Sequence, residues 1–181
     1  VLLNGILAHG LDYDDTHPGA IVHPSGSAFP CALGVGEHID ASGKDVLTAY
    51  ALGVEIATRV GLAGKGLMHA MGYHTTGIAG HFGCAVAAGK LFNLSPQRLQ
   101  YAQGFAGSTA SAISEHRADG AWNKRLHQAW APWIVFALAF CGVLATITPS
   151  RKAPSASEYP ARAASHDNVK SSPITSRVRT S

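Results

Sequence analysis

Acidic and histidine side chains gather near the start of the chain. The cluster comprises His9, Asp12, Asp15, Thr16, His17 and His23. If residues 1–16 form a helix, His9, Asp12 and Thr16 are spaced three and four residues apart and share one face. Asp12 lies nearest the apolar residues of this segment, where burying an unpaired carboxylate is costly. A buried carboxylate beside a histidine is typical of an acid/base unit, whereas Asp14 and Asp15 equally fit a solvated helix end.

A second candidate is His74, which precedes Thr75, Thr76 and Gly77. We expect a helix to begin here, with Thr75 or Thr76 as its cap. Free N–H groups and the helix dipole at such an end bind carboxylates. A histidine at this position supplies a proton or a positive charge, although a histidine in a loop is commonly incidental.

A third candidate is the run Lys124-Arg125-Leu126-His127, which follows the polar stretch 114–120. Cations beside a glycine-containing loop suit an anionic substrate. The alternative is a solvated loop that precedes the next helix.

Apolar spacing predicts the helices that must position these side chains. We expect helices over about 1–16, 27–39, 44–62, 76–92 and 95–113, with a loop over 63–76. Pro30 and Pro132 are each assigned to the first turn of a helix. The glycines of helix 76–92 predict close backbone approach. The fold class is therefore all-α, a helical bundle packed through small residues.

Composition excludes several classes of protein. Charged residues make up 14% of 181 residues and apolar residues 46%, which rules out a wholly disordered chain. The three cysteines fit neither a disulfide scaffold nor a zinc knuckle, and they suggest a reducing compartment. Residues 1–150 hold eight Lys and Arg against nine Asp and Glu, a net charge of −1, with no basic stripe for nucleic acid. No phosphate-binding glycine motif is present.

The last third of the sequence differs in character. Residues 129–147 are uncharged and almost wholly apolar, which fits a buried helix better than a membrane span. Residues 149–181 are rich in Ser, Pro, Ala and Arg, and we expect a disordered basic tail. We expect three parts: a helical domain over 1–127, an apolar helix over 128–148 and the tail.

Five strings occur in order along the chain: NGILAHGLDYDDTH, HPSG, GVEIATRVG, GYHTTGIAGHFGCAVAAGKLFNLS and KRLH. Together they resemble the MmgE/PrpD family, which includes 2-methylcitrate dehydratase, cis-aconitate decarboxylase and iminodisuccinate epimerase. The resemblance covers about 1–127. It implies part of a large all-α domain that, in the family, accompanies a smaller α/β domain, so the chain resembles a fragment of a longer protein.

The resemblance also implies site residues. Matched by motif, these are Asp12, Thr16, His23, His74 and Lys124, which line the family's proposed active site. We expect His23 or His74 as the acid/base group, Asp12 as its orienting partner and Thr16 as a hydrogen-bond donor. Lys124 is expected to clamp a substrate carboxylate, with Thr75 and His127 as further substrate-binding residues.

The function expected from these residues is a lyase that acts on a small di- or tricarboxylate by acid/base chemistry. It would need no cofactor and no metal, and act as a cytoplasmic or, in a eukaryote, mitochondrial homodimer. One alternative is a metal-dependent hydrolase that uses His9, Asp12, Asp15, His17 and His23. The other is a non-catalytic remnant tethered to a membrane by 129–147. We expect the 181-residue chain alone to be inactive and poorly soluble.

Overall fold

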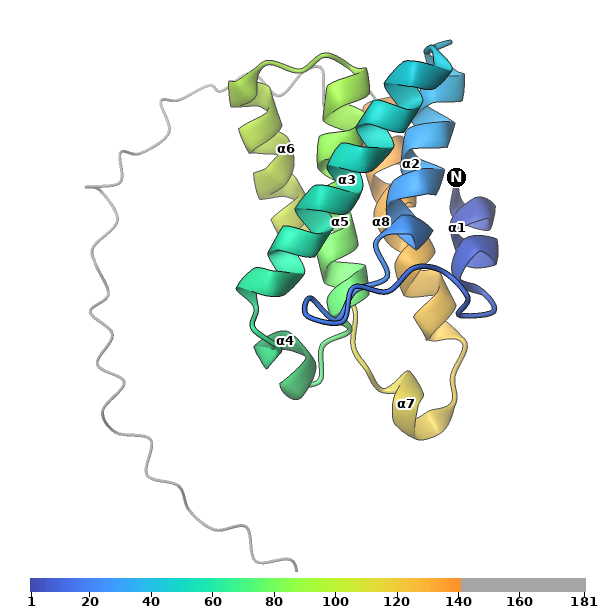
Figure 1. Ribbon diagram of the computed structural model, residues 1–181, viewed down its shortest axis with the longest axis vertical. Coiled ribbons are helices and arrows are strands. Elements are labelled where there is room, and N and C mark those ends of the chain that lie inside the picture. Colours follow the sequence, from blue (N-terminus) through green and yellow to red (C-terminus); the bar gives the residue numbers. More distant parts are fainter. Residues whose placement is uncertain (141–181) are drawn as a thin grey trace, which may run out of the picture. The chain divides into compact units, whose positions relative to one another are not determined.

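The computed structural model describes residues 1–140, which form helices and no strand (Figure 1). The helices are α1 Leu2–His9, α2 Ser25–His38, α3 Gly43–Ala63, α4 Leu67–Ala70, α5 Thr75–Leu91, α6 Pro96–Thr109, α7 His116–Asp119 and α8 Asn123–Phe140. The predicted all-α class is confirmed. The tail 149–181 and the final residues of the apolar run 129–147 lie outside the described residues.

Helix α5 occupies the middle of the bundle and packs against α2, α3, α6 and α8 (Figure 1). Most of the buried apolar side chains are alanines, as predicted. The backbones of α3 and α5 approach closely: a Cβ added to Gly83 would lie 2.5 Å from the carbonyl oxygen of Gly53. Small side chains therefore let the helix backbones touch, and larger side chains such as Phe82 and Leu91 pack against this core of small residues.

Two of the predicted helix starts are capped as expected. The hydroxyl of Ser42 accepts from the backbone N–H of Asp45, and that of Ser95 accepts from Arg98. The start of α5 differs from the prediction: its N-cap is His74, whose side chain makes no capping bond.

The predicted helix 1–16 is wrong, because α1 ends at His9. After Gly10 the chain turns, and Asp12 adopts a left-handed conformation with φ of 60°. Aspartate tolerates this conformation better than most residues. The side chains of residues 12–16 therefore do not continue a face of α1, and the helical-face argument for His9, Asp12 and Thr16 fails.

Both prolines lie deeper in their helices than predicted. Helix α2 begins at Ser25 and α8 at Asn123, so Pro30 and Pro132 are interior and fully buried. Each removes one backbone donor from its helix. Helix α8 therefore starts five residues before the predicted boundary at 128 and carries the predicted residues Lys124 and His127.

The loop region around residues 63–76 contains the short helix α4, which was not predicted. Helix α6 ends at Thr109 rather than at 113. The reason is that the next residues pair with the segment before α5: Tyr73 forms an antiparallel bridge with Ile113, and Ser114 donates to the carbonyl of Gly72. This pairing fixes the start of α5 to the segment that leads into α7.

Among the described helices, α3 alone is long and apolar enough to cross a bilayer by length and composition. Core helices of soluble proteins pass the same test. In this bundle α3 packs against α2 and α5. The run 129–147 extends past the described residues.

Candidate active site

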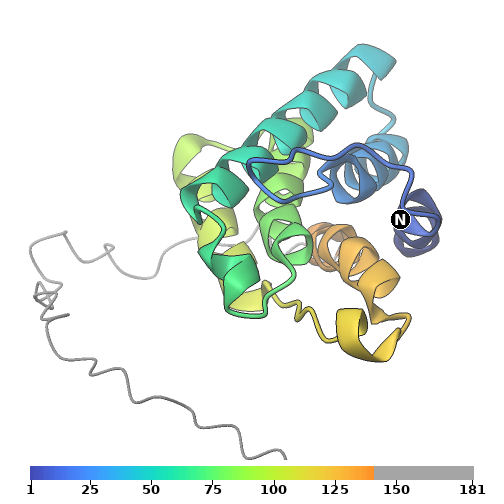
Figure 2. The same ribbon diagram turned by 60° about the horizontal axis from the view of Figure 1, so that its bottom comes forward.

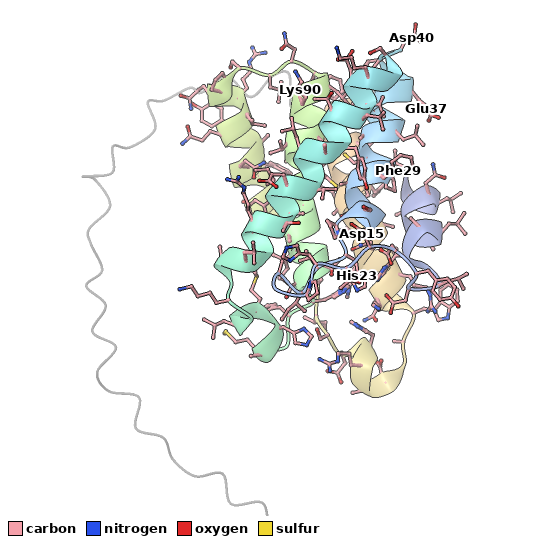
Figure 3. All side chains as sticks on the ribbon, viewed as in Figure 1. Asp15, His23, Phe29, Glu37, Asp40 and Lys90 are labelled. Atoms are coloured by element: carbon pink, nitrogen blue, oxygen red, sulfur yellow. The ribbon has the colours of Figure 1, made fainter. Side chains whose placement is uncertain are left out.

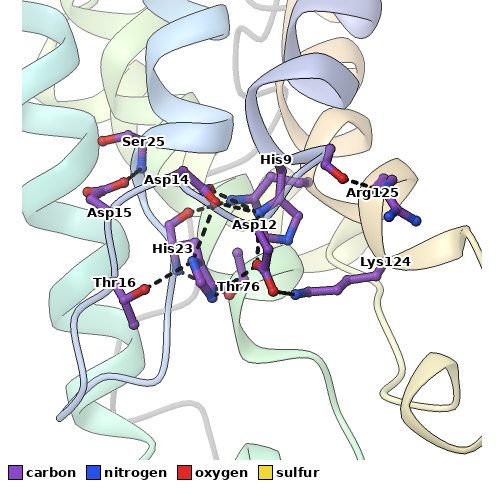
Figure 4. Close-up of polar contacts among 12 residues, drawn as sticks. His9, Asp12, Asp14, Asp15, Thr16, His23, Ser25, Thr76, Lys124 and Arg125 are labelled. Carbon is purple, nitrogen blue, oxygen red and sulfur yellow. Dashed lines mark hydrogen bonds and ion pairs between the residues drawn. The ribbon is translucent and has the colours of Figure 1, made fainter. Parts of the chain in front are cut away.

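The predicted site residues gather at one end of the bundle. His23 and Asp15 lie at this end, whereas Asp40 and Lys90 lie at the other (Figure 3). Three parts of the chain meet there: the loop between α1 and α2, the start of α5, and the segment from α7 into α8 (Figure 2). The close-up in Figure 4 shows the polar contacts that join them.

Asp12 and Lys124 form an ion pair between the loop after α1 and the first turn of α8. Lys124 Nζ donates to Asp12 Oδ2 at 2.6 Å. This hydrogen bond is the main reason why the pKa of Asp12 is lowered, with desolvation acting against it. The Asp12 side chain is 53% exposed, so the prediction that Asp12 is the buried acid of the cluster is wrong.

The buried acid is Asp14, whose side chain is only 8% exposed. Both of its carboxylate oxygens lie 2.9 Å from Nδ1 of His9, which is fully buried (Figure 4). The carboxylate lies against Gly26 in the first turn of α2: a Cβ added there would be 2.8 Å from Asp14 Oδ2. Glycine at this position therefore makes room for the carboxylate.

His23 is held by contacts from four directions. Its Nδ1 lies 3.2 Å from the hydroxyl of Thr16 and 3.6 Å from Oδ1 of Asp14. Its backbone N–H donates to Thr76 Oγ1 at 3.2 Å, and its carbonyl accepts from the side-chain amide of Gln128. The position of the ring is thus set by α5, α8 and its own loop.

His74 is the N-cap residue of α5, and its backbone N–H donates to the carbonyl of Ala112. The side chain is buried, and its Nδ1 has no hydrogen-bond partner within the described part of the chain. The pKa of His74 is lowered to about 3, mainly by burial, with smaller contributions from the nearby His116, His127, His9 and Lys124. His74 is therefore a neutral imidazole at neutral pH.

A cavity of about 330 Å³ opens beside these groups. Four predicted residues line it: Thr16, His23, His74 and Lys124. The other polar lining residues are His69, Thr76, Ser114, His116 and Arg117. A volume near 300 Å³ suits a small molecule. Asp12 lines a neighbouring cavity of about 320 Å³, which shares Lys124 and His116 with the first.

Two predicted substrate-binding residues lie next to the cavity but do not line it. Thr75 is buried, and its hydroxyl has no partner among the described residues; its neighbour Thr76 lines the cavity instead. The ring of His127 lies 5.7 Å from that of His74, and its burial lowers its pKa. His127 thus contributes to the surroundings of His74.

Asp15 and His17 have local roles in the loop. Asp15 accepts from the backbone N–H of Ser25 at the start of α2, and His17 accepts from that of Ala20. Sequence reasoning assigned no role to Gln128 and judged Asp14 equally compatible with solvent. The only sequence signal for Asp14 was an acid near apolar residues. The only signal for Gln128 was a polar residue that precedes an apolar run.

One group within residues 1–140 has the geometry to hold a metal ion. One ligand atom from each of His9, Asp12, Asp14 and His23 lies within 4.8 Å of the others. Asp15 and His17, named in the sequence-based metal hypothesis, are not part of it. The ammonium of Lys124 already neutralises Asp12, and the carboxylate of Asp14 accepts from His9. These contacts favour proton chemistry, because a divalent cation would compete with both.

Comparison with known proteins agrees with the family resemblance. The model of the MmgE/PrpD N-terminal domain matches residues 1–140, past residue 127, where the resemblance read from motifs ended. Human cis-aconitate decarboxylase is 33% identical over 116 residues, which cover 61% of this chain and 24% of that protein. A cis-aconitate decarboxylase-like protein of Aspergillus oryzae is 30% identical over 138 residues, 72% of this chain and 28% of that protein.

The mouse cis-aconitate decarboxylase gives a similar result, with 33% identity over 123 residues that cover 61% of this chain and 23% of the relative. The chain thus spans about a quarter of the length of these relatives. Because the family model covers more than half of the chain, the chain belongs to the MmgE/PrpD family.

Proposed function

We propose that the protein is a lyase that removes a group from a small di- or tricarboxylate by proton transfer, with cis-aconitate as the first candidate substrate. The observation that carries the proposal is that His23, His74 and Lys124 line one cavity. The names of the relatives support this reaction class.

Lys124 is the group suited to hold a substrate carboxylate. An ammonium has three donors, and Asp12 accepts one of them. The remaining donors are available to a carboxylate in the cavity. Arg117 also lines the cavity, so a substrate with more than one carboxylate meets more than one cation.

His74 and His23 are the groups suited to move the proton. In decarboxylation a C–C bond breaks, carbon dioxide leaves, and the electron pair left on carbon takes up one proton. His74 is neutral at neutral pH because its pKa is about 3. A substrate anion beside His74 favours the protonated imidazole and so raises its pKa. Substrate binding thereby favours the form of His74 that can donate a proton.

The same residues also suit dehydration of a compound such as 2-methylcitrate. One imidazole would then take the proton next to a carboxylate, and the other would protonate the departing hydroxide. Both reactions can use the same carboxylate clamp and the imidazoles of this cavity. The substrate therefore has to be found by assay.

The test is a substrate screen of the full-length protein with cis-aconitate, citrate and 2-methylcitrate, followed by product NMR. We expect carbon dioxide release or loss of water from one of the three. Absence of turnover with all three would refute the proposal.

A metal-dependent hydrolase is the second candidate, because four donors lie close together. It predicts stoichiometric zinc, manganese or iron in the active protein and loss of activity with a chelator. The acid/base proposal predicts that chelator treatment leaves kcat/KM unchanged. Elemental analysis of active protein before and after dialysis against EDTA separates the two.

A further inference from the structure

Behind the cavity lies a buried pair, Asp14 and His9, that has no assigned role. The ring centre of His9 is 5.0 Å from that of His23 and 6.4 Å from that of His74. The ring planes of His9 and His74 are nearly parallel, at 27°. His9 therefore packs against both imidazoles that the proposed function uses.

The Asp14 contact determines which nitrogen of His9 carries the proton. A carboxylate only accepts hydrogen bonds, so Nδ1 of His9 must be the donor. The other nitrogen, Nε2, is buried and has no partner within residues 1–140. The ring of His9 cannot turn without losing the bond to Asp14, so Nε2 stays on the side of the other imidazoles.

Asp14 is itself fixed on several sides. Its carboxylate packs between His9, Gly26 and His23, with Oδ1 at 3.6 Å from Nδ1 of His23. At that distance the contact with His23 is electrostatic rather than a hydrogen bond. The buried Asp14 carboxylate is hydrogen-bonded to His9 and lies beside His23. Asp14 therefore links the two imidazoles.

We propose that Asp14 and His9 are positioning residues for the reaction: Asp14 holds the proton on Nδ1 of His9, and the fixed His9 ring keeps the His23 and His74 rings facing the cavity. The inference rests on the proposed function. Neither residue lines the 330 Å³ cavity that holds His23 and His74, although His9 borders the neighbouring cavity of about 320 Å³. We therefore assign both residues a role through the two imidazoles.

The test compares variants of the full-length protein on the substrate that the screen identifies. Asp14→Asn removes the negative charge and adds an amide donor that competes for Nδ1. We expect it to lower kcat at least about tenfold, which is part of the usual general acid/base contribution. KM is expected to stay within twofold, because Lys124 is untouched. The control is Asp15→Asn, at the neighbouring exposed acid that only accepts from Ser25; kcat is expected to be unchanged.

A second pair of variants tests His9. The amide nitrogen of Asn can replace Nδ1 as a donor to Asp14, whereas Leu cannot. We expect His9→Asn to keep more of kcat than His9→Leu does, with similar melting temperatures for the two. Equal kcat in the two variants would contradict the positioning role of the Nδ1 bond.

The tautomer of His9 gives a readout that needs no turnover. In protein labelled with 15N-histidine, the ring nitrogen shifts should show His9 protonated at Nδ1, and Asp14→Asn should move the proton to Nε2. Active wild-type protein with an Asp14→Asn kcat within twofold would overturn this inference and leave the proposed function standing. Inactive wild-type protein would overturn the proposed function, and a His9 that carries no proton on Nδ1 in wild-type protein would overturn the inference by itself.

Discussion

Nζ of Lys124 lies 2.6 Å from Oδ2 of Asp12, although 112 residues separate the two in the sequence. The contact joins the first turn of α8 to the loop after α1. Next to it, Nε of Arg125 donates to the carbonyl of Gly10 at 2.7 Å. The carboxylate clamp is therefore assembled only when both ends of the described chain pack together.

Replacing Lys124 tests that clamp. Lys124→Ala in the full-length protein should lower kcat/KM by about 30-fold, which corresponds to about 2 kcal/mol. This is the low end of the range for the loss of one partner of a charge pair, because the pair with Asp12 is partly exposed. Lys44→Ala, at an exposed lysine in the first turn of α3, serves as the control and should be neutral. Steady-state kinetics decide the matter: an unchanged kcat/KM in Lys124→Ala would remove Lys124 from the site.

The buried His74 predicts how stability depends on pH. Its pKa is near 6.5 when unfolded and about 3 when folded, so the unfolded chain binds more protons between these values. The stability that goes with a neutral, buried His74 is fully present above pH 6.5 and is lost as the pH falls towards 3. His74→Gln should therefore reduce the stability difference between pH 7 and pH 5 by up to about 2 kcal/mol. Urea unfolding at the two pH values measures it, and an identical difference in wild-type protein and variant would contradict the burial of His74.

Asp12 adds a second effect with the same sign at lower pH. The pKa of Asp12 is lowered mainly by Lys124. The ionised carboxylate therefore stabilises the folded protein above the ordinary pKa of an aspartate, and this stabilisation is lost as the pH falls below that value. Asp12→Asn should flatten the stability profile only below about pH 4.

The close approach of α3 and α5 predicts opposite effects of two glycine substitutions. Gly83→Ala would put a methyl group 2.5 Å from the carbonyl oxygen of Gly53 and should cost about 1–3 kcal/mol. Gly104→Ala, in α6 with open space around it, should stabilise by up to about 1 kcal/mol. Thermal unfolding of both variants measures the contrast. Similar shifts for the two would mean that the helices are not in backbone contact.

The outer face of α1 and the residue just beyond it predict how the 181-residue chain behaves alone. Leu3, Leu7 and Leu11 are 72%, 76% and 76% exposed. Exposed leucines add apolar surface, which favours association. We expect the isolated chain to bind a dye for apolar surfaces and to scatter light, and Leu→Gln changes at the three positions to lessen both. A monodisperse wild-type chain that binds no dye would contradict this expectation.

The helices were predictable wherever local chemistry decided their ends. Ser42 and Ser95 cap their helices in the predicted way, and the small residues of α5 predicted its close packing. The start of α5 was predicted to within one residue, but His74 as its N-cap was not, because the position of His74 depends on the pairing of Tyr73 with Ile113, forty residues away.

The candidate site was predictable in its residue types but not in its geometry. The motifs pointed to Thr16, His23, His74 and Lys124, which do line one cavity. The roles of Asp12 and Asp14 were exchanged, because the turn at Asp12 carries Asp14 back to His9. A left-handed aspartate leaves no periodic pattern in a sequence, so helical spacing predicted the wrong buried acid.

The central claim is that imidazoles at this cavity transfer a proton to or from a carboxylate substrate. The most direct test is kcat/KM for cis-aconitate in full-length wild-type protein and in His74→Gln, with His38→Gln at the far end of α2 as the control. The account predicts a loss of at least about 100-fold in His74→Gln, within the range for general acid/base groups, and none in the control. A folded His74→Gln variant with kcat/KM within twofold of the wild-type value would contradict it.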